Sequence, residues 1–287
     1  LRLNDAGASC LLDITGAIGA TVHGLSLHGG DLGTGVHGIF LGPNPQRKEE
    51  DTPRIERCHI SHFSGNGIHL GPVWCFSVRS CEVIFNKGHG LWVRGWDGFV
   101  LDNWFSGNGG AGYAATEENA SMTMTGNRIE WNRCGGIVIA GGSHYNITGN
   151  YIDRSGCCGI SLRGRAGSPC LCITITGNVI YRSGKPEWTA DEEQSAHVRF
   201  EEAHGLVFSG NSMCVGCDDS GGRNSPLHGM ILRGLKNSVV KGNALHLGAL
   251  RRLVDDRGGH GEGVVIGENV GCLLAQADQP IWDSPDR

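Results

Sequence analysis

One short motif recurs through the middle of the chain and restricts the possible folds more than any other feature. Its three clearest copies are Ser121-Met-Thr-Met-Thr-Gly-Asn-Arg-Ile129, Tyr145-Asn-Ile-Thr-Gly-Asn-Tyr-Ile152 and Ile173-Thr-Ile-Thr-Gly-Asn-Val-Ile180. Their asparagines, at positions 127, 150 and 178, are 23 and 28 residues apart. A repeat of this length cannot bury a hydrophobic core by itself, so neighbouring copies must stack on one another.

The same register extends in both directions. The motif asparagine recurs as Asn103, Asn211 and Asn243, while Cys58 and Cys81 hold its place in earlier repeats. An apolar residue stands three positions before and two positions after each of these residues. A second pattern, Gly-Ile-x-Leu or a close variant, begins at Gly38, Gly67, Gly90, Gly136, Gly159, Gly229 and Gly263. Alternation with a period of two residues indicates strands that bury one face.

Three short strands in each repeat of 22 to 24 residues, joined by Gly and Asn corners, predict an all-β fold. The predicted architecture is a right-handed parallel β-helix of about nine coils, in one domain covering residues 1–287. Within it we expect regular coils over about 20–184, coils with stacked insertions over about 185–271, and a C-terminal tail at 272–287. Stacked asparagine amides can hydrogen-bond from coil to coil, so we interpret the motif asparagines as structural.

Composition limits the partners of the chain. The net charge of −5 gives no basic surface for nucleic acid, and no apolar run approaches the ~20 residues of a membrane helix. Glycine, at 48 of 287 residues, fits a fold with many tight corners. Unpaired thiols favour a reducing, cytoplasmic compartment. The chain begins without Met, however, so a removed leader and an extracellular or periplasmic location stay open.

The twelve cysteines do not form a spaced framework. Cys58 and Cys81 occupy one position in adjacent repeats, and Cys134 and Cys157 occupy another. We predict that both pairs stack in the interior, with a Cys134–Cys157 disulfide as the alternative. Structural zinc sites normally need four ligands, and Cys214-x-x-Cys217 has no recognisable second pair, so we expect no metal and no cofactor.

Spacing points to the functional part of the chain. In five successive repeats, the first apolar residue of the next Gly-Ile strand comes ten residues after the motif position. In the following three repeats this spacing is 20, 19 and 21 residues. These longer spacings predict insertions at one corner of three consecutive coils, over 185–196, 217–227 and 248–262. Stacked insertions would form a wall beside the Gly-Ile strands, and function in repeat proteins gathers on such a face.

Acidic, basic and aromatic side chains converge on this predicted wall. Glu201, Asp218 and Asp219 are the candidate catalytic residues, because glycosidic bond cleavage needs two carboxylates. The candidate substrate-binding residues are Arg163, Arg199, Arg233, His197, His228, Trp188, His69 and Trp92.

Each candidate also has a purely structural interpretation. Arg163, Glu201 and Arg233 can form an ion-pair ladder between neighbouring coils, and the loop aspartates can be solvated. Trp188 can anchor its loop rather than stack on a sugar. His69 and Trp92 lie on earlier coils, where they form either a second subsite or a packed surface patch.

The Thr-Gly-Asn-x-Ile and Gly-Ile-x-Leu register resembles the right-handed parallel β-helix superfamily. That superfamily includes pectate lyases, polygalacturonase-type hydrolases, alginate epimerases and phage tailspikes. A narrower likeness, to the inulin fructotransferase family, rests on Glu201–Gly210, Asn211, the insertion that follows and His228-Gly-Met-Ile-Leu-Arg-Gly-Leu-Lys-Asn-Ser-Val-Val-Lys-Gly-Asn243. This resemblance implies a trimer and a catalytic carboxylate on the strand face. Here the first outward column holds Arg199, and no carboxylate is expected in that column.

Three hypotheses follow. The first is a carbohydrate-active enzyme that cleaves or rearranges glycosidic bonds of a poly- or oligosaccharide by carboxylate acid/base catalysis. The second is a lyase or epimerase acting on a uronic-acid polymer, with Arg or His as the base. The third is a non-catalytic glycan-binding or tailspike-like solenoid.

Overall fold

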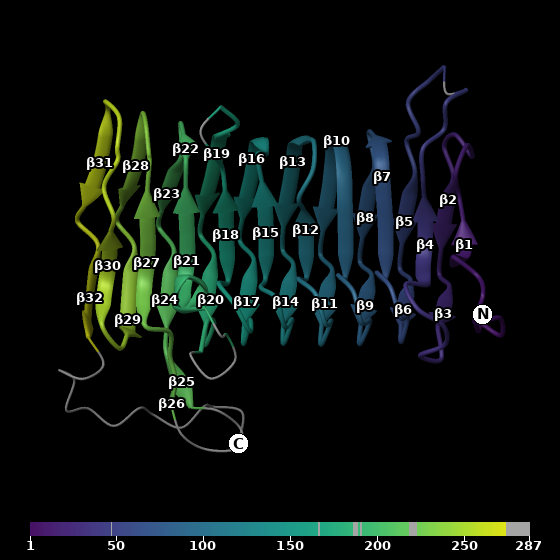
Figure 1. The fold of residues 1–287 in the computed structure, drawn as a ribbon, viewed down its shortest axis with the longest axis horizontal. Coiled ribbons are helices and arrows are strands. Elements are labelled where there is room, and N and C mark those ends of the chain that lie inside the picture. The colour runs from purple at the N-terminus through teal and green to yellow at the C-terminus, as the bar shows by residue number, and fades with distance from the viewer. Residues whose placement is uncertain (47, 166, 186–188, 190, 218–222, 274–287) are drawn as a thin grey trace.

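The computed structural model describes residues 1–273 except 47, 166, 186–188, 190 and 218–222. The chain winds as a long solenoid of stacked coils, and neighbouring coils pair as parallel strands (Figure 1). The predicted right-handed parallel β-helix is therefore confirmed. Each coil contributes strands to three faces, here called sheets I, II and III.

Sheets I and II join into one twenty-stranded sheet because β10 runs through both. Sheet I contains the Gly-Ile strands: β1 (Cys10–Asp13), β4 (His37–Leu41), β7 (Ile68–Trp74), β10 (Leu91–Leu101), β12 (Tyr113–Ala115), β15 (Ile137–Ala140), β18 (Ile160–Arg163), β21 (Ala196–Glu201), β27 (His228–Arg233) and β30 (Arg252–Asp256). Sheet II contains the strands before the motif asparagine: β2 (Thr21–His23), β5 (Arg54–Glu56), β8 (Ser77–Arg79), β13 (Asn119–Thr125), β16 (Ser143–Thr148), β19 (Cys170–Thr176), β22 (Ala203–His204), β23 (Val207–Ser209), β28 (Ser238–Lys241) and β31 (Val264–Gly267).

Sheet III contains the strands that follow the motif position, one for each of ten coils. They are β3 (Ser26–His28), β6 (His59–Ser61), β9 (Glu82–Ile84), β11 (Trp104–Ser106), β14 (Arg128–Glu130), β17 (Tyr151–Asp153), β20 (Val179–Tyr181), β24 (Ser212–Cys214), β29 (Ala244–Ala249) and β32 (Val270–Leu273). Outside the coils lie a 3₁₀ turn, η1 (Glu192–Gln194), and a small antiparallel hairpin, β25 (Gly216–Cys217) with β26 (Arg223–Asn224).

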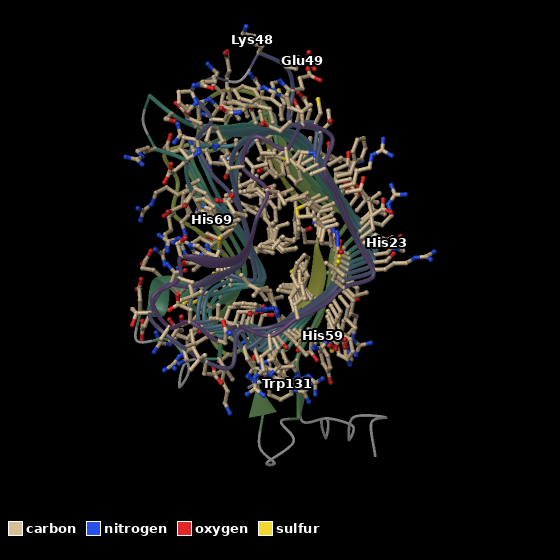
Figure 2. The ribbon with its side chains drawn as sticks, turned by 90° about the vertical axis from the view of Figure 1, so that its right-hand side faces the viewer. His23, Lys48, Glu49, His59, His69 and Trp131 are labelled. Carbon is tan, nitrogen blue, oxygen red and sulfur yellow. The ribbon has the colours of Figure 1, made fainter. Side chains whose placement is uncertain are left out.

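The core is made of the apolar residues that the repeat register predicts. Those three positions before the motif residue are fully buried from Ile55 to Val240. Those two positions after it, from Ile60 to Leu245, are at most 1% exposed. Seen end-on, their side chains stack inside the tube formed by the three sheets (Figure 2). Alternate residues thus bury one face of each strand, as a period of two requires.

A ladder of asparagine amides runs along one corner of the solenoid. The Nδ2 atom of each donates to Oδ1 of the next at 2.8–3.0 Å. The ladder consists of Asn103, Asn127, Asn150, Asn178, Asn211, Asn243 and Asn269. A second ladder at the next corner, Asn86–Asn108–Asn132, was not predicted.

The cysteines follow the prediction only in part. Cys58 and Cys81 are buried at the ladder position, and their thiols contact backbone carbonyls of Val22 and Ile55 at 3.6 and 3.5 Å. Cys134 and Cys157 are free thiols, so the alternative of a disulfide between them is wrong. Cys134 is also exposed, so interior stacking is wrong for it as well.

The last coils differ from the predicted register. The segment Gly263-Val-Val-Ile266 lies in β31, which pairs with β28 of sheet II rather than continuing sheet I. The strand that continues sheet I after β27 is β30. The stretch 248–262 therefore contains a regular strand of sheet I, β30, and the prediction of a third insertion there is wrong. Asn269, three residues beyond Ile266, marks the correct register through its place in the ladder.

Candidate functional site

The acids and arginines of the last coils form one connected cluster on the outer side of sheet I. This acid–arginine network consists of Glu193, Arg199, Glu201, Arg233, Arg252, Asp255 and Arg257. Strands β21, β27 and β30 supply five of these residues, while η1 supplies Glu193 and Arg257 directly follows β30. Strand register explains the alignment, since Arg199 lies beside Ile231 and Ile231 lies beside Asp255.

Glu201 is the carboxylate at the centre of the predicted site. Its side chain is 15% exposed, and its Oε2 accepts a hydrogen bond of 2.8 Å from Nη2 of Arg199. Arg233, its neighbour on β27, approaches Oε1 at 3.8 Å. Two guanidinium groups thus lie beside one partly buried carboxylate.

Glu193 approaches the network from the segment before β21. Its carboxylate lies 3.7 Å from Nη2 of Arg199 and pairs with Arg257. The hydrogen bond from Arg257 is the main cause that lowers the pKa of Glu193 below its usual range. Arg199 also donates to the backbone carbonyl of Glu193 at 3.2 Å, which fixes η1 against the strand face.

Asp255 is the residue that sequence reasoning missed. It stands in the first outward column of sheet I, where no carboxylate was expected, so that expectation is wrong. Burial raises the pKa of Asp255, but hydrogen bonds from Arg257 (2.9 Å) and Arg252 (2.6 Å) outweigh it and lower the pKa overall. The motif spacing of Asn269 was the signal that would have placed Asp255 correctly.

His228 lies beside this acid. Its Nε2 is 3.9 Å from Oδ2 of Asp255, and the imidazole is 9% exposed. Burial lowers the pKa of His228, and the charge of Asp255 opposes that shift only in part. A neutral imidazole next to a carboxylate can accept a proton, so His228 is a possible base at the edge of the network.

Two predicted binding residues lie apart from the network. Arg163 is in register with Glu201, as the ladder interpretation expected. Its guanidinium instead contacts Oγ of Ser161 at 3.1 Å and Oε1 of Gln194 at 3.0 Å, so the three-residue ion-pair ladder is wrong at this end. His197 is fully buried, which contradicts a role in contacting substrate.

His69 and Trp92 belong to an aromatic stack on earlier coils. The ring of His69 lies 4.2 Å from that of Trp92, 5.1 Å from Phe40 and 4.6 Å from His37. Burial is the main cause that lowers the pKa of His69 to about 4, followed by repulsion from His37 and His89. This packing fits the surface-patch interpretation of the pair. Trp188, Asp218 and Asp219 lie outside the described residues.

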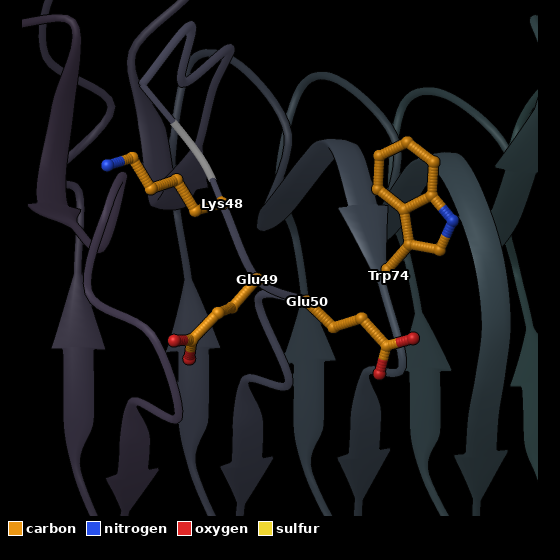
Figure 3. A pocket seen from close by; sticks show the side chains of 4 residues that line it. All are labelled: Lys48, Glu49, Glu50 and Trp74. Carbon is orange, nitrogen blue, oxygen red and sulfur yellow. The ribbon is translucent and has the colours of Figure 1, made fainter.

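Figure 3 shows another hollow, on the loop between β4 and β5. Lys48, Glu49, Glu50 and Trp74 line its volume of about 310 Å³. Glu50 extends toward Trp74, whereas Lys48 and Glu49 turn away from it (Figure 3). This hollow lies on early coils, far from the acid–arginine network. Among the described residues there is no group of three or more His, Cys, Asp or Glu that could hold a metal ion.

The network offers carboxylates and guanidinium groups at one place on a rigid face. Such groups can bind hydroxyls or a carboxylate and can transfer protons to a substrate. In the described part of the chain, no helix is long and apolar enough to cross a bilayer.

Comparisons with known proteins agree with this architecture. A family model described as the right handed beta helix region matches residues 37–168, 67–212 and 118–272. The crystal structure of DFA-IIIase from Arthrobacter chlorophenolicus A6 in complex with GF2 is similar, with a TM-score of 0.58 and 12% identity over 94% of this chain and 68% of that chain.

Two further solved structures have the same fold. The Dettilon tailspike protein has a TM-score of 0.55 and 13% identity, and the match covers 94% of this chain and 56% of the tailspike. The A-module of the mannuronan C-5 epimerase from Azotobacter vinelandii has a TM-score of 0.51 and 16% identity over 88% of this chain and 73% of the module. At such identities the likeness shows a common fold and no more.

Proposed function

The chain belongs to the right-handed β-helix family, and from that premise we propose that it is a carbohydrate-active enzyme that cleaves or rearranges glycosidic bonds at the acid–arginine network. The observation that carries this proposal is a pair of carboxylates, Glu193 and Glu201, held on one guanidinium group. Both contact Nη2 of Arg199, at 3.7 and 2.8 Å, so the nearest oxygens of the two carboxylates are at most about 6.5 Å apart. Catalytic carboxyl groups of glycosidases are about 5–9.5 Å apart.

The two acids would take different roles. Glu201 is the more enclosed carboxylate and lies between Arg199 and Arg233, and we propose it as the base or nucleophile. The proton donor is the second carboxylate. Arg257 lowers the pKa of Glu193, so Glu193 could donate a proton only if substrate displaced Arg257. Asp218 and Asp219 stay predictions for the same role.

Similar proteins support a sugar as the substrate. One of the similar structures is a DFA-IIIase in complex with GF2, and another is an epimerase of mannuronan, which is a polysaccharide. Arg199 and Arg233 would orient hydroxyl groups of the sugar beside Glu201. Neither role requires a metal ion.

The test of this proposal is Glu201→Gln, which keeps the shape of the side chain and removes its charge. We expect turnover to fall at least about 10³-fold, because the base or nucleophile is lost, with little change in thermal unfolding. Glu118→Gln is the matched control, since this acid is 69% exposed and lies on an earlier coil. Retained turnover in Glu201→Gln removes Glu201 from the mechanism.

The excess of arginine favours a second candidate, a lyase or epimerase on a uronic-acid polymer. Within the described residues, four arginines of the network face three carboxylates. An additional guanidinium group can neutralise the carboxylate of a uronate, and neutral His228 can abstract the adjacent proton.

A product screen separates these candidates. The protein is incubated with neutral glycans, fructans and uronic-acid polymers, and reducing ends, ultraviolet absorbance and product mass are recorded. New saccharides without absorbance support cleavage or rearrangement of glycosidic bonds. An absorbing unsaturated end supports the lyase, while saturable binding without any product supports a non-catalytic solenoid.

A further inference from the structure

A second site follows from the corner that connects sheet III to sheet I. In each of six consecutive coils the first residue after the sheet III strand has a left-handed backbone conformation, with φ between 45° and 64°. The series is His62, Phe85, Gly107, Trp131, Arg154 and Arg182. Figure 2 shows Trp131 at this corner of the cross-section. The series changes from aromatic to cationic side chains where it reaches the last coils.

Gly107 interrupts this column and leaves a cavity beside it. The cavity has a volume of about 620 Å³ and is lined by Gly107, Asn108, Gly109, Trp131, Arg133, Arg154 and Gly156. Gly109 and Gly156 cannot carry a side chain, because a Cβ atom would lie 2.4 and 2.2 Å from backbone oxygens of the preceding coil. Arg133 is therefore flanked by glycines on both neighbouring coils.

The aromatic wall of the cavity is held in place by a cation. The guanidinium of Arg154 lies 4.2 Å from the centre of the Trp131 ring, and Arg154 is only 6% exposed. Its Nη1 donates to the buried carboxylate of Asp153 at 3.0 Å. The indole is 42% exposed, so part of its surface stays open to a ligand.

Cationic side chains gather beside the cavity. Asp153 also accepts hydrogen bonds from the buried Arg182 at 2.9 and 2.6 Å, so one carboxylate bonds two guanidinium groups. Arg133 is exposed, and none of the described carboxylates forms an ion pair with it. An anionic ligand in this cavity would meet a fixed indole and an available guanidinium group.

We propose that this cavity is a subsite for a uronate unit of the substrate chain. An exposed indole face suits the apolar face of a sugar ring, and a guanidinium fork matches the planar carboxylate of a uronate. The proposal rests on the proposed function, since it treats the ligand as part of a glycan that reaches the acid–arginine network.

The cavity is connected to that network by neighbouring residues. Gly156 lines the cavity, and the thiol of the next residue, Cys157, lies 4.0 Å from Oγ1 of Thr189. Thr189 in turn belongs to the segment that leads to η1 and Glu193. Trp131 and Glu201 are two coils apart, or about 10 Å along the solenoid axis. They also lie at different places around the coil, because Ala140, which is in register with Glu201 through Arg163, comes nine residues after Trp131. A glycan that connects the two sites therefore has to run along the axis and across sheet I.

The experiment is isothermal titration calorimetry of the whole chain with hexagalacturonate, hexamannuronate and neutral cellohexaose. The variants are Trp131→Ala and Arg133→Gln, with Phe99→Ala and Arg57→Gln as controls at exposed positions on other parts of the surface. Thermal unfolding checks that each variant is folded.

We expect a uronate hexamer to bind at least tenfold more tightly than cellohexaose, and salt to weaken that binding. Trp131→Ala and Arg133→Gln should each weaken it at least tenfold, with both controls close to the parent protein. Equal binding of neutral and acidic hexamers, unchanged affinity in the two cavity variants, or no binding of either uronate would overturn the subsite. Because calorimetry needs no turnover, a silent product screen would refute the proposed function and leave this measurement unaffected.

Discussion

At the residue scale, the asparagine ladder shows why one side chain recurs at one corner. Each Oδ1 accepts from the backbone N–H and from the Nδ2 of the asparagine one coil earlier, as Asn150 does for Asn127 at 3.0 and 2.8 Å. Each Nδ2 also donates to a backbone carbonyl, such as that of Met124. A buried corner thereby keeps its polar groups satisfied.

Asn150→Ala should therefore destabilise the protein strongly. The change leaves two buried donors of Asn127 without their acceptor, and each costs roughly 1–3 kcal/mol, so the free energy of unfolding should fall by roughly 2–5 kcal/mol. Urea unfolding measures this loss. Asn146→Ala, at an exposed position of the preceding strand β16, should change it by less than about 0.5 kcal/mol. Equal losses in the two variants would contradict a special role for the ladder.

Sequence reasoning worked at this scale where a residue type has one structural reason to recur. The Thr-Gly-Asn repeat predicted the main ladder and the buried positions around it. Asn86, Asn108 and Asn132 escaped notice because the residue before each asparagine differs, being Phe85, Gly107 and Trp131, and because the series changes to Ser155 and Ser183 after three coils. The cavity beside Gly107 and Trp131 was not predicted, because it depends on the side-chain volumes in three neighbouring coils. A single repeat does not show these volumes.

At the element scale, ion pairs attach the segment containing η1 to the end of β30. Arg257 pairs with Glu193 on one side and with Asp255, at 2.9 Å, on the other. Arg251 and Glu192 form a more exposed pair between the same two parts of the chain. These ion pairs matter for the attachment of η1, because η1 buries none of its own residues.

The stability of this attachment should depend on pH. The folded-state pKa values of Glu193 and Asp255 lie below their ordinary values of 4.5 and 3.8. Depressed values mean that these acids contribute stability above the ordinary pKa and lose it as the pH falls through the folded-state pKa. Stability should thus decline from about pH 5 downward.

Arg257→Gln should reduce the part of this decline that Glu193 and Asp255 cause. We expect the difference in unfolding free energy between pH 6 and pH 3.5 to be smaller in Arg257→Gln than in the parent protein, as measured by urea unfolding at both pH values. Arg251→Gln removes the exposed pair and should leave the difference nearly unchanged, because exposed ion pairs contribute little. An identical pH dependence in all three proteins would argue against the Arg257 attachment.

Period-two alternation identified most strands but did not decide which sheet each strand joins. Gly263-Val-Val-Ile266 has the pattern of a sheet I strand and lies in sheet II, because both sheets bury one face in the same way. That error moved Asp255 from a strand face into a supposed loop. The first two insertions include residues outside the described part of the chain and stay predictions from spacing.

At the scale of the whole molecule, the solenoid fixes the distance between the corner cavity and the acid–arginine network. Consecutive coils pair through continuous parallel ladders from β12 to β30. Two sites on such a rod keep their spacing without any hinge. If the cavity binds one unit of a glycan whose scissile bond lies at Glu201, only a substrate that is long enough can occupy the cavity and the acid–arginine network together.

Turnover should then depend on the length of the substrate, and Trp131 should determine that dependence. Substrates too short to reach from the cavity to Glu201 should have equal kcat/KM in the parent protein and Trp131→Ala, because they never occupy both sites. For longer uronate-containing substrates, kcat/KM should rise in the parent protein and stay flat in Trp131→Ala, a difference of at least tenfold at the hexamer. Steady-state kinetics on a series from dimer to octamer provides the measurement. If Trp131→Ala lowers kcat/KM by the same factor at every substrate length, Trp131 acts through the fold rather than through substrate. If kcat/KM still rises with length in Trp131→Ala, the distant contacts lie elsewhere on the surface.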